Sequence, residues 1–318
     1  MPTALITDHG FPSIELERKV LETAGFTLLE VKPICKTEDD VIRSCGNADV
    51  LLVQWAPITR RVFESLPQVR GIVRYGIGVD NVDVKSAKEL GRMVSNVPRY
   101  CLDEVSDHTI TMILSLARRI PHDSRQLEHG GWGIVPFLPI PAFSDLTLGL
   151  IGFGSIAKKV SQKARPFRFR QIAFDPLAPD AAFAELGVER QKLDAVLRTA
   201  DIISLHCPLT PETRHVINAE SIARMRPGVL LVNTARGPLV NEADLVTALK
   251  AGKISGAGLD VYEKEPLPSD SPLRSLPNVI LTSHAASVST RSLERLQIQA
   301  AEAARDILQG KRPAGALV

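Results

Sequence analysis

Short apolar runs alternate with helix-like segments along almost the whole chain, and no other feature restricts the possible folds as strongly. Strands that are separated by helices pair in parallel, and the helices then cover both faces of the sheet. The first series predicts strands at 4–7, 49–53, 71–74 and 92–95, with helices at 14–24, 60–66 and 84–90.

A second series begins near residue 146 and shows the same alternation. Its runs are almost continuously apolar, as expected for strands that are buried on both faces. It predicts strands at 146–151, 171–175, 201–206, 228–233, 254–259 and 279–281, with helices at 156–164, 193–199 and 242–251. Together the two series predict an α/β fold with two Rossmann-like doubly wound parallel-sheet domains.

Two longer segments, 102–120 and 289–309, have the character of long helices. We expect them to cross between the domains and return the chain to the first one. The stretch 132–141 contains three prolines, which remove backbone donors and exclude a regular helix. It is too apolar for a solvated linker, so we interpret it as an ordered arm that packs against another surface, such as a second subunit.

The composition is that of a globular protein in water, with 318 residues, 44% hydrophobic and 23% charged. The net charge of +2, without a basic run, argues against nucleic acid and anionic membrane as partners. No apolar stretch approaches the roughly 20 residues of a membrane helix, and the first residues lack a signal-peptide pattern. These features predict a cytoplasmic protein.

The cysteines are far apart and have no CxxC spacing. They are Cys35, Cys45, Cys101 and Cys207. We interpret them as buried thiols in a reducing compartment, and we predict neither a disulfide framework nor a metal site.

A glycine-rich turn, Gly152-Phe-Gly154, connects a predicted strand to a predicted helix. Such a backbone can approach a pyrophosphate at the helix N-terminus, where amide groups and the helix dipole favour an anion. Asp175 stands 23 residues after Gly152, at the end of the next apolar run. A carboxylate there accepts a hydrogen bond from a ribose 2′-hydroxyl and repels a 2′-phosphate. The pattern favours a NAD site over a simple tight turn, and NAD over NADP.

A second glycine-containing turn, formed by Tyr75, Gly76, Ile77 and Gly78, also follows an apolar run. It lacks a helix directly behind it and an acid about 20 residues further on. Its backbone amides are therefore candidates for holding a substrate carboxylate, although an ordinary turn explains the residues equally well.

Arg236 lies just past the end of a predicted buried strand, where ligands bind in doubly wound sheets. Its planar, permanently charged fork suits a 2-oxo acid, because it can bond both the carboxylate and the carbonyl oxygen. The alternative is a surface arginine at a helix start. That alternative is disfavoured, since a cation at a helix N-terminus opposes the helix dipole.

His284 follows another strand, and Glu265 lies in the polar segment before it. If the two side chains meet, the carboxylate stabilises the protonated imidazole and keeps a proton available for donation. The pattern alone leaves two questions open. His206 also follows a strand, and Glu263 is as good a partner as Glu265.

With these motifs in this order, the chain resembles the NAD-dependent D-2-hydroxyacid dehydrogenases, the family of phosphoglycerate dehydrogenase, glyoxylate/hydroxypyruvate reductase and D-lactate dehydrogenase. The resemblance covers almost the whole chain. It rests on 74–83 (RYGIGVDNVD), 96–98 (NVP), 149–156 (GLIGFGSI), 206–210 (HCPLT), 233–237 (NTARG), 259–262 (LDVY), Glu265-Pro266 and His284.

The resemblance implies that Arg236 binds and orients the substrate, that His284 is the acid/base, and that Glu265 is its partner. The implied cofactor contacts are Gly152, Phe153, Gly154, Ser155, Ile156, Asp175, His206, Cys207, Pro208, Thr213, Thr234, Ala235, Arg236, Asp260 and His284. The implied substrate contacts are Tyr75, Gly76, Ile77, Gly78, Arg236 and His284.

The resemblance also implies a discontinuous substrate domain, 1–98 with 287–318, and a NAD-binding domain, 99–286. Through the latter, members commonly form homodimers. The implied reaction moves a hydride between NAD(H) and a small D-2-hydroxy or 2-oxo acid.

The substrate itself is left open. Phosphoglycerate-specific members carry arginines just after the strand that here ends near Val53, whereas this chain has Gln54-Trp55. Phosphoglycerate dehydrogenase proper stays an alternative. So do a phosphite dehydrogenase and a non-catalytic, NAD-gated co-repressor-like binding protein, while Glu265 argues against a formate dehydrogenase.

Overall fold

The computed structural model describes residues 1–133 and 140–318 and divides the chain into two compact units. Unit 1 comprises Met1–Cys101 and Ser289–Val318, and unit 2 comprises Leu102–Val288. The chain therefore enters unit 2 where one long helix begins and returns to unit 1 just before another. The predicted arm at 132–141 falls mostly on 134–139, which lie outside the described residues.

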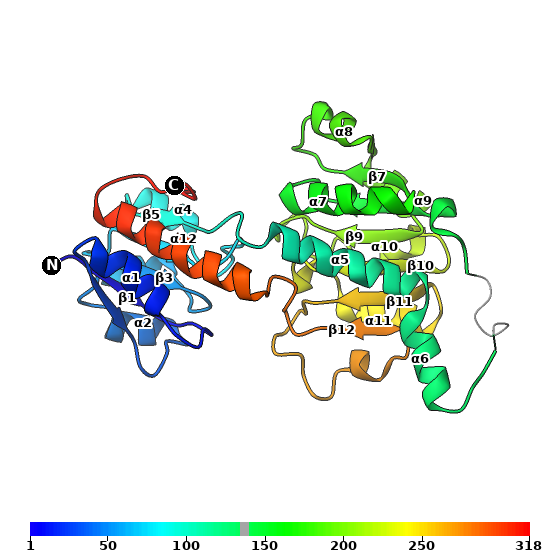
Figure 1. Cartoon of the computed structure of the whole chain (residues 1–318), viewed down its shortest axis with the longest axis horizontal. Helices are drawn as coiled ribbons and strands as arrows, with labels where there is room; N and C mark the ends of the chain where they lie inside the picture. Colours follow the sequence, from blue (N-terminus) through cyan, green and yellow to red (C-terminus); the bar gives the residue numbers. More distant parts are fainter. Residues whose placement is uncertain (134–139) are drawn as a thin grey trace. The chain divides into compact units, whose positions relative to one another are not determined.

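Unit 1 is built on a parallel sheet in the order β2-β1-β3-β4-β5 (Figure 1). The order reverses between β1 and β3, so the sheet is doubly wound. Its strands are β1 (Thr3–Ile6), β2 (Thr27–Glu30), β3 (Val50–Val53), β4 (Gly71–Arg74) and β5 (Met93–Ser95), and its helices are α1 (Glu15–Thr23), α2 (Glu38–Ser44), α3 (Arg60–Ser65), α4 (Val84–Glu89) and α12 (Thr290–Leu308).

Unit 2 contains a larger parallel sheet in the order β12-β11-β10-β9-β6-β7-β8, with the reversal between β6 and β9. Its strands are β6 (Thr147–Ile151), β7 (Arg170–Phe174), β8 (Glu189–Arg190), β9 (Ile202–Leu205), β10 (Val229–Asn233), β11 (Ile254–Leu259) and β12 (Val279–Leu281). Its helices are α5 (Leu102–Ala117), α6 (Ile120–Glu128), α7 (Ser155–Ala164), α8 (Asp180–Leu186), α9 (Leu193–Thr199), α10 (Ala219–Arg224) and α11 (Glu242–Lys250). The two sheets confirm the predicted α/β fold.

Hydrophobic cores lie on both faces of the unit 2 sheet. On one face α5 and α7 lie side by side, and α5 also packs on β10 and β11 (Figure 1). On the other face α9 packs on β6 and β7, and α11 packs on β11. Two adjacent residues of β10 belong to the cores on opposite faces of the sheet. Leu231 is in the core that contains Leu245 of α11, and Val232 is in the core that contains Ile113 of α5. This alternation explains why the strand sequences are almost continuously apolar.

The predicted helix at 102–120 is wrong at its end. Helix α5 ends at Ala117, Arg119 adopts a left-handed backbone with φ of 57°, and a separate helix, α6, begins at Ile120. A single left-handed residue interrupts the right-handed helix, so the continuous apolar spacing concealed a break.

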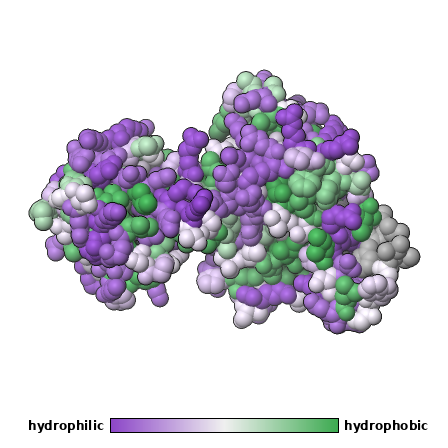
Figure 2. Space-filling model, in the orientation of Figure 1, coloured by the Kyte–Doolittle hydropathy of each residue, from purple (hydrophilic) through white to green (hydrophobic). Residues whose placement is uncertain are grey.

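The molecular face in Figure 2 is mainly hydrophilic, with scattered apolar patches. Among the described helices, none is both long and apolar enough to cross a membrane. The four cysteines are free thiols, and three of them are buried.

Candidate active site

The predicted site residues of unit 2 follow successive strands of its sheet. Gly152 comes after β6, His206 after β9, and Thr234 after β10, while Asp260 follows β11 and His284 lies in the turn after β12. All these strands are parallel, so their carboxyl ends meet at one edge. The edge includes the reversal between β6 and β9, which is where doubly wound sheets bind ligands.

The glycine turn has the geometry of a phosphate cradle. Gly152 has a φ of 93°, and a Cβ atom there would lie 2.5 Å from the backbone nitrogen of Cys207. Gly154 caps the N-terminus of α7, and the space beside it is open, with no atom within 4 Å of a Cβ position. An anion can therefore approach the free amides of the first turn of α7.

Asp175 is held rigidly beside that turn. One carboxylate oxygen accepts a hydrogen bond from Phe153 N at 2.7 Å, and the other accepts from Leu177 N at 2.8 Å and Ala178 N at 3.0 Å. A carboxylate has about four acceptor positions, so one position remains for a ribose hydroxyl. The residues present therefore fit a dinucleotide at this turn.

A cavity of about 480 Å³ lies beside Asp175 and is large enough for part of a nucleotide. Its charged wall includes Arg190, which is already engaged by Asp180 at 2.5 Å and by the Asp175 carbonyl oxygen at 3.1 Å. The cavity is lined by Phe174, Asp175, Pro176, Arg190, Gln191, Lys192 and Ala195.

The segment after β9 contains four further predicted cofactor contacts, His206, Cys207, Pro208 and Thr213. Burial lowers the pKa of His206 to about 3 and raises the pKa of the Cys207 thiol to about 11. His206 therefore stays neutral, with its Nε2 2.9 Å from Ser204 Oγ. The Thr213 hydroxyl donates to Pro208 O at 2.6 Å and fixes the loop that follows.

Arg236 lies in a turn after β10 that is held by side-chain hydrogen bonds. The buried Asn233 side chain accepts from Ala235 N at 3.0 Å and donates to Arg236 O at 2.8 Å. The half-buried Arg236 donates from Nη1 to Ala235 O at 2.7 Å. A 3-10 turn, Gly237–Leu239, follows, and α11 begins only at Glu242, so the predicted helix start next to Arg236 is a single tight turn.

His284 pairs with Glu265. The distance from His284 Nδ1 to Glu265 Oε2 is 2.7 Å, and Glu265 Oε1 accepts a hydrogen bond from Tyr262 N at 3.0 Å. The equally plausible Glu263 instead binds His215 at 2.6 Å. The structure thus distinguishes two glutamates that the sequence pattern could not separate.

The charge of Glu265 determines which imidazole nitrogen is free. Burial alone raises its pKa, but the hydrogen bond and charge of His284, the Tyr262 amide and the Arg236 charge together lower the pKa below its usual value. An ionised carboxylate only accepts hydrogen bonds. His284 Nδ1 must therefore carry a proton, and Nε2 is the nitrogen that can exchange a proton with a ligand.

Asp260 holds the turn that carries His284. His284 has a left-handed φ of 55°, which costs a residue with a side chain about 1–2 kcal/mol. The buried Asp260 carboxylate accepts from Ala285 N at 2.8 Å and from Ala286 N at 2.9 Å, and its carbonyl oxygen accepts from His284 N at 2.8 Å. These bonds maintain the strained turn, as expected at a functional site.

The second predicted turn, residues 75–78, belongs to unit 1. Tyr75 is anchored at both ends, since its amide donates to Val53 O at 2.8 Å and its hydroxyl to the buried Glu17 at 3.0 Å. Within the described part of the chain, the amides of Gly76, Ile77 and Gly78 donate to no other group.

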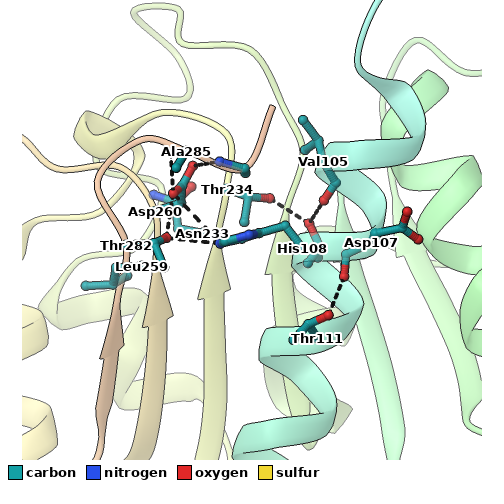
Figure 3. Close-up of polar contacts among 12 residues, drawn as sticks. Val105, Asp107, His108, Thr111, Asn233, Thr234, Leu259, Asp260, Thr282 and Ala285 are labelled. Carbon is teal, nitrogen blue, oxygen red and sulfur yellow. Dashed lines mark hydrogen bonds and ion pairs between the residues drawn. The ribbon is translucent and has the colours of Figure 1, made fainter. Parts of the chain in front are cut away.

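Sequence reasoning missed the polar residues that support the site from α5. His108 Nε2 lies 3.0 Å from Thr282 Oγ1 (Figure 3). Thr109 Oγ1 lies 2.8 Å from Thr234 Oγ1. Both side chains lie among several other polar residues in the first half of α5, and the sequence pattern does not single these two out.

A parallel doubly wound sheet with a phosphate cradle at its reversal is the architecture of a dinucleotide-binding domain. The model of the D-isomer specific 2-hydroxyacid dehydrogenase NAD-binding domain matches residues 110–286. The chain belongs to the D-isomer specific 2-hydroxyacid dehydrogenase family, binds NAD and is an oxidoreductase with 2-hydroxyacid dehydrogenase activity.

Three relatives show the spread within this family. The chain is 37% identical to a glyoxylate reductase of Korarchaeum cryptofilum, over 86% of this chain and 82% of that one. It is 38% identical to a D-3-phosphoglycerate dehydrogenase of Methanocaldococcus jannaschii, over 98% of this chain but only 58% of the relative. A D-lactate dehydrogenase structure from Aquifex aeolicus, complexed with NAD and lactic acid, has a TM-score of 0.84 and 27% identity, covering 97% and 96% of the two chains.

Proposed function

We propose that the chain reduces a small, uncharged-side-chain 2-oxo acid to the D-2-hydroxy acid with NADH, using His284 as proton donor, Glu265 as its partner and Arg236 as the substrate-binding cation. The observation that carries this proposal is the 2.7 Å bond between His284 Nδ1 and Glu265, which leaves Nε2 free. Bound NADH supplies the hydride that reduces C2 of the substrate.

The protein's own residues perform the remaining steps. Arg236 binds the substrate carboxylate and stabilises the negative charge that develops on the carbonyl oxygen. Protonated His284 donates from Nε2 to that oxygen, and Glu265 stabilises the imidazolium beforehand. In the opposite direction, neutral His284 accepts the hydroxyl proton at Nε2. NAD is held by the glycine turn, Asp175 and the backbone after β9 and β10.

Unit 1 is proposed as the substrate domain because its turn at 75–78 offers a carboxylate backbone amides that have no partner among residues 1–133 and 140–318. The loop after β3 supports a substrate without a phosphate. Buried Asp8 holds this loop by accepting from Trp55 N at 2.5 Å and Ala56 N at 3.2 Å, and the Trp55 side chain is 57% exposed.

The two arginines that follow this loop in the sequence also argue against a phosphorylated substrate. Arg60 is engaged by Glu64 at 2.8 Å and Glu89 at 2.6 Å, and Arg61 by Asp39 at 2.6 Å. Both belong to α3 and are neutralised by local carboxylates. We therefore place glyoxylate and hydroxypyruvate ahead of 3-phosphohydroxypyruvate.

The test is NADH oxidation at neutral pH against glyoxylate, hydroxypyruvate, pyruvate, phenylpyruvate, oxaloacetate and 3-phosphohydroxypyruvate. We expect the highest kcat/KM with one of the uncharged-side-chain acids. A clear preference for the phosphorylated acid would show that the substrate assignment is wrong, and silence with all six acids, despite NADH binding, would contradict the enzyme assignment.

Cofactor preference follows from Asp175. A contact between two unit charges near a protein surface is worth about 1–4 kcal/mol, so Asp175→Asn is expected to lower the NADH over NADPH ratio of kcat/KM by roughly fivefold to a thousandfold. The exposed Asp194, which pairs with Arg198 at 2.8 Å, provides the control variant Asp194→Asn. An unchanged ratio in a folded Asp175→Asn protein would remove Asp175 from cofactor selection.

We also propose that the chain forms a homodimer through unit 2. Helix α6 contributes no buried residue, and Ile120 and Leu127 are 56% and 50% exposed. Trp132, just beyond it, is 90% exposed. Sedimentation of the wild type is expected to give a dimer that dissociates in an Ile120→Lys, Leu127→Lys variant, whereas a monomeric wild type would overturn this proposal.

A further inference from the structure

Helix α5 reaches the two loops that carry Arg236 and His284 through adjacent residues. His108 Nε2 lies 3.0 Å from Thr282 Oγ1, and Thr282 Oγ1 lies 2.5 Å from Asp260 Oδ1 (Figure 3). Next to His108, Thr109 Oγ1 lies 2.8 Å from Thr234 Oγ1, two residues before Arg236. The mechanism described above uses none of these α5 side chains.

The direction of the bonds follows from counting protons. Thr282 has one hydroxyl proton, and Asp260 Oδ1, as a carboxylate oxygen 2.5 Å away, must accept it. The Thr282 oxygen then has only lone pairs to offer to His108. His108 must therefore donate from Nε2, at 3.0 Å, because an unprotonated Nε2 would place two acceptors against each other.

This chain of bonds ends on the carboxylate that holds the His284 turn. Asp260 accepts from Thr282, from Ala285 N and from Ala286 N, and its carbonyl oxygen accepts from His284 N. Asp260 is only 1% exposed, whereas the His108 side chain is 26% exposed. These hydrogen bonds form a relay, His108–Thr282–Asp260, which connects a partly exposed donor to the buried carboxylate that holds the His284 turn.

We propose that His108 is a positioning residue, which acts through Thr282 and Asp260 to keep the left-handed turn of His284 in its working geometry. The proposal rests on the proposed role of His284 as the acid/base. His108 does not touch the reacting groups. Its loss removes one of the two hydrogen bonds that hold the Thr282 hydroxyl, so that Thr282 and the Asp260 carboxylate are held less firmly, the turn relaxes and Nε2 of His284 loses its alignment.

The kinetic test uses variants that separate hydrogen bonding from packing. We expect His108→Leu and Thr282→Val each to lower kcat roughly tenfold with little change in KM, since small misalignments reduce proton-transfer rates strongly. The double variant is expected to lose no more than either single one, because both break the same relay. His108→Gln, whose amide can donate from the same position, is expected to recover most of the activity.

A matched control is Thr111→Val, also on α5. The Thr111 hydroxyl donates only to Asp107 O of its own helix, at 2.8 Å, and should leave kcat unchanged. Additive losses in the double variant, or no recovery in His108→Gln despite a wild-type Tm, would reduce His108 to a packing residue and overturn the proposal.

A second measurement does not depend on activity. Long-range ¹H–¹⁵N NMR of the ¹⁵N-histidine-labelled wild type, assigned with His108→Gln, should show His108 with its proton on Nε2. A neutral ring protonated only on Nδ1 would exclude the relay. If the wild type reduced no 2-oxo acid, the proposed function would fail, while the NMR result would still decide whether the relay exists.

Discussion

Replacing His284 with alanine is expected to lower kcat for 2-oxo acid reduction by about three orders of magnitude, which is within the usual range for a general acid. NADH affinity should change little, because the glycine turn and Asp175 hold the cofactor elsewhere on the sheet edge. The physical reason is the loss of Nε2, the free nitrogen of an imidazole whose Nδ1 bonds Glu265 at 2.7 Å. Stopped-flow turnover and NADH fluorescence titration check the two parts separately.

His215 provides an unusually close control for this variant. It also binds a glutamate, Glu263, at 2.6 Å, and it also has a left-handed backbone, with φ of 52° against 55° for His284. His215→Ala should therefore reproduce any general cost of losing a strained, paired histidine but keep kcat near the wild-type value. Equal losses in the two variants would count against a chemical role for His284.

Replacing Arg236 with alanine is the second large change. Truncating one partner of a desolvated charge pair costs about 2–5 kcal/mol, so kcat/KM should fall by roughly a thousandfold, with a raised KM. Arg236→Lys keeps the charge but loses the planar fork, and should recover only part of the loss. Initial-rate kinetics with the preferred acid measure both effects.

Arg226 is a suitable control arginine, because it pairs with Asp201 at 2.6 Å and precedes β10 rather than following it. Arg226→Ala should leave KM unchanged. If Arg236→Ala had the same KM and kcat for the acid as Arg226→Ala, the proposed substrate-binding role of Arg236 would be wrong.

The parts of the site that could be predicted from the sequence depend on rules that involve only neighbouring residues in the chain. A buried strand followed by Gly152 and Gly154 predicts a phosphate turn because glycine is required there, and the structure shows the clash that any Cβ at Gly152 would cause. Parallel strands place their carboxyl ends together, so residues that follow each run could be expected at one edge. The sequence also contains a local signal for a helix that the apolar spacing does not indicate. Thr37 and Asp40 form a capping box at the start of α2, the known sequence signature of a helix start.

Other features could not be predicted because they depend on tertiary geometry. Glu263 and Glu265 differ by two positions in one loop, and only the folded path of that loop assigns one to His215 and the other to His284. The break between α5 and α6 depends on the left-handed Arg119. Pro121 in the first turn of α6 is typical of a helix start, but it does not reveal the left-handed residue before it. His108 reaches Thr282 across 174 positions of the chain.

The most direct test of the proposed chemistry follows the hydride itself. The preferred 2-oxo acid is reduced with NADH that carries deuterium at both C4 positions of the nicotinamide, and the product is analysed by mass spectrometry and chiral chromatography. The proposed mechanism predicts one deuterium at C2 of a D-configured 2-hydroxy acid, together with a proton from solvent on its hydroxyl oxygen. A product of L configuration, or one without deuterium at C2, would contradict it.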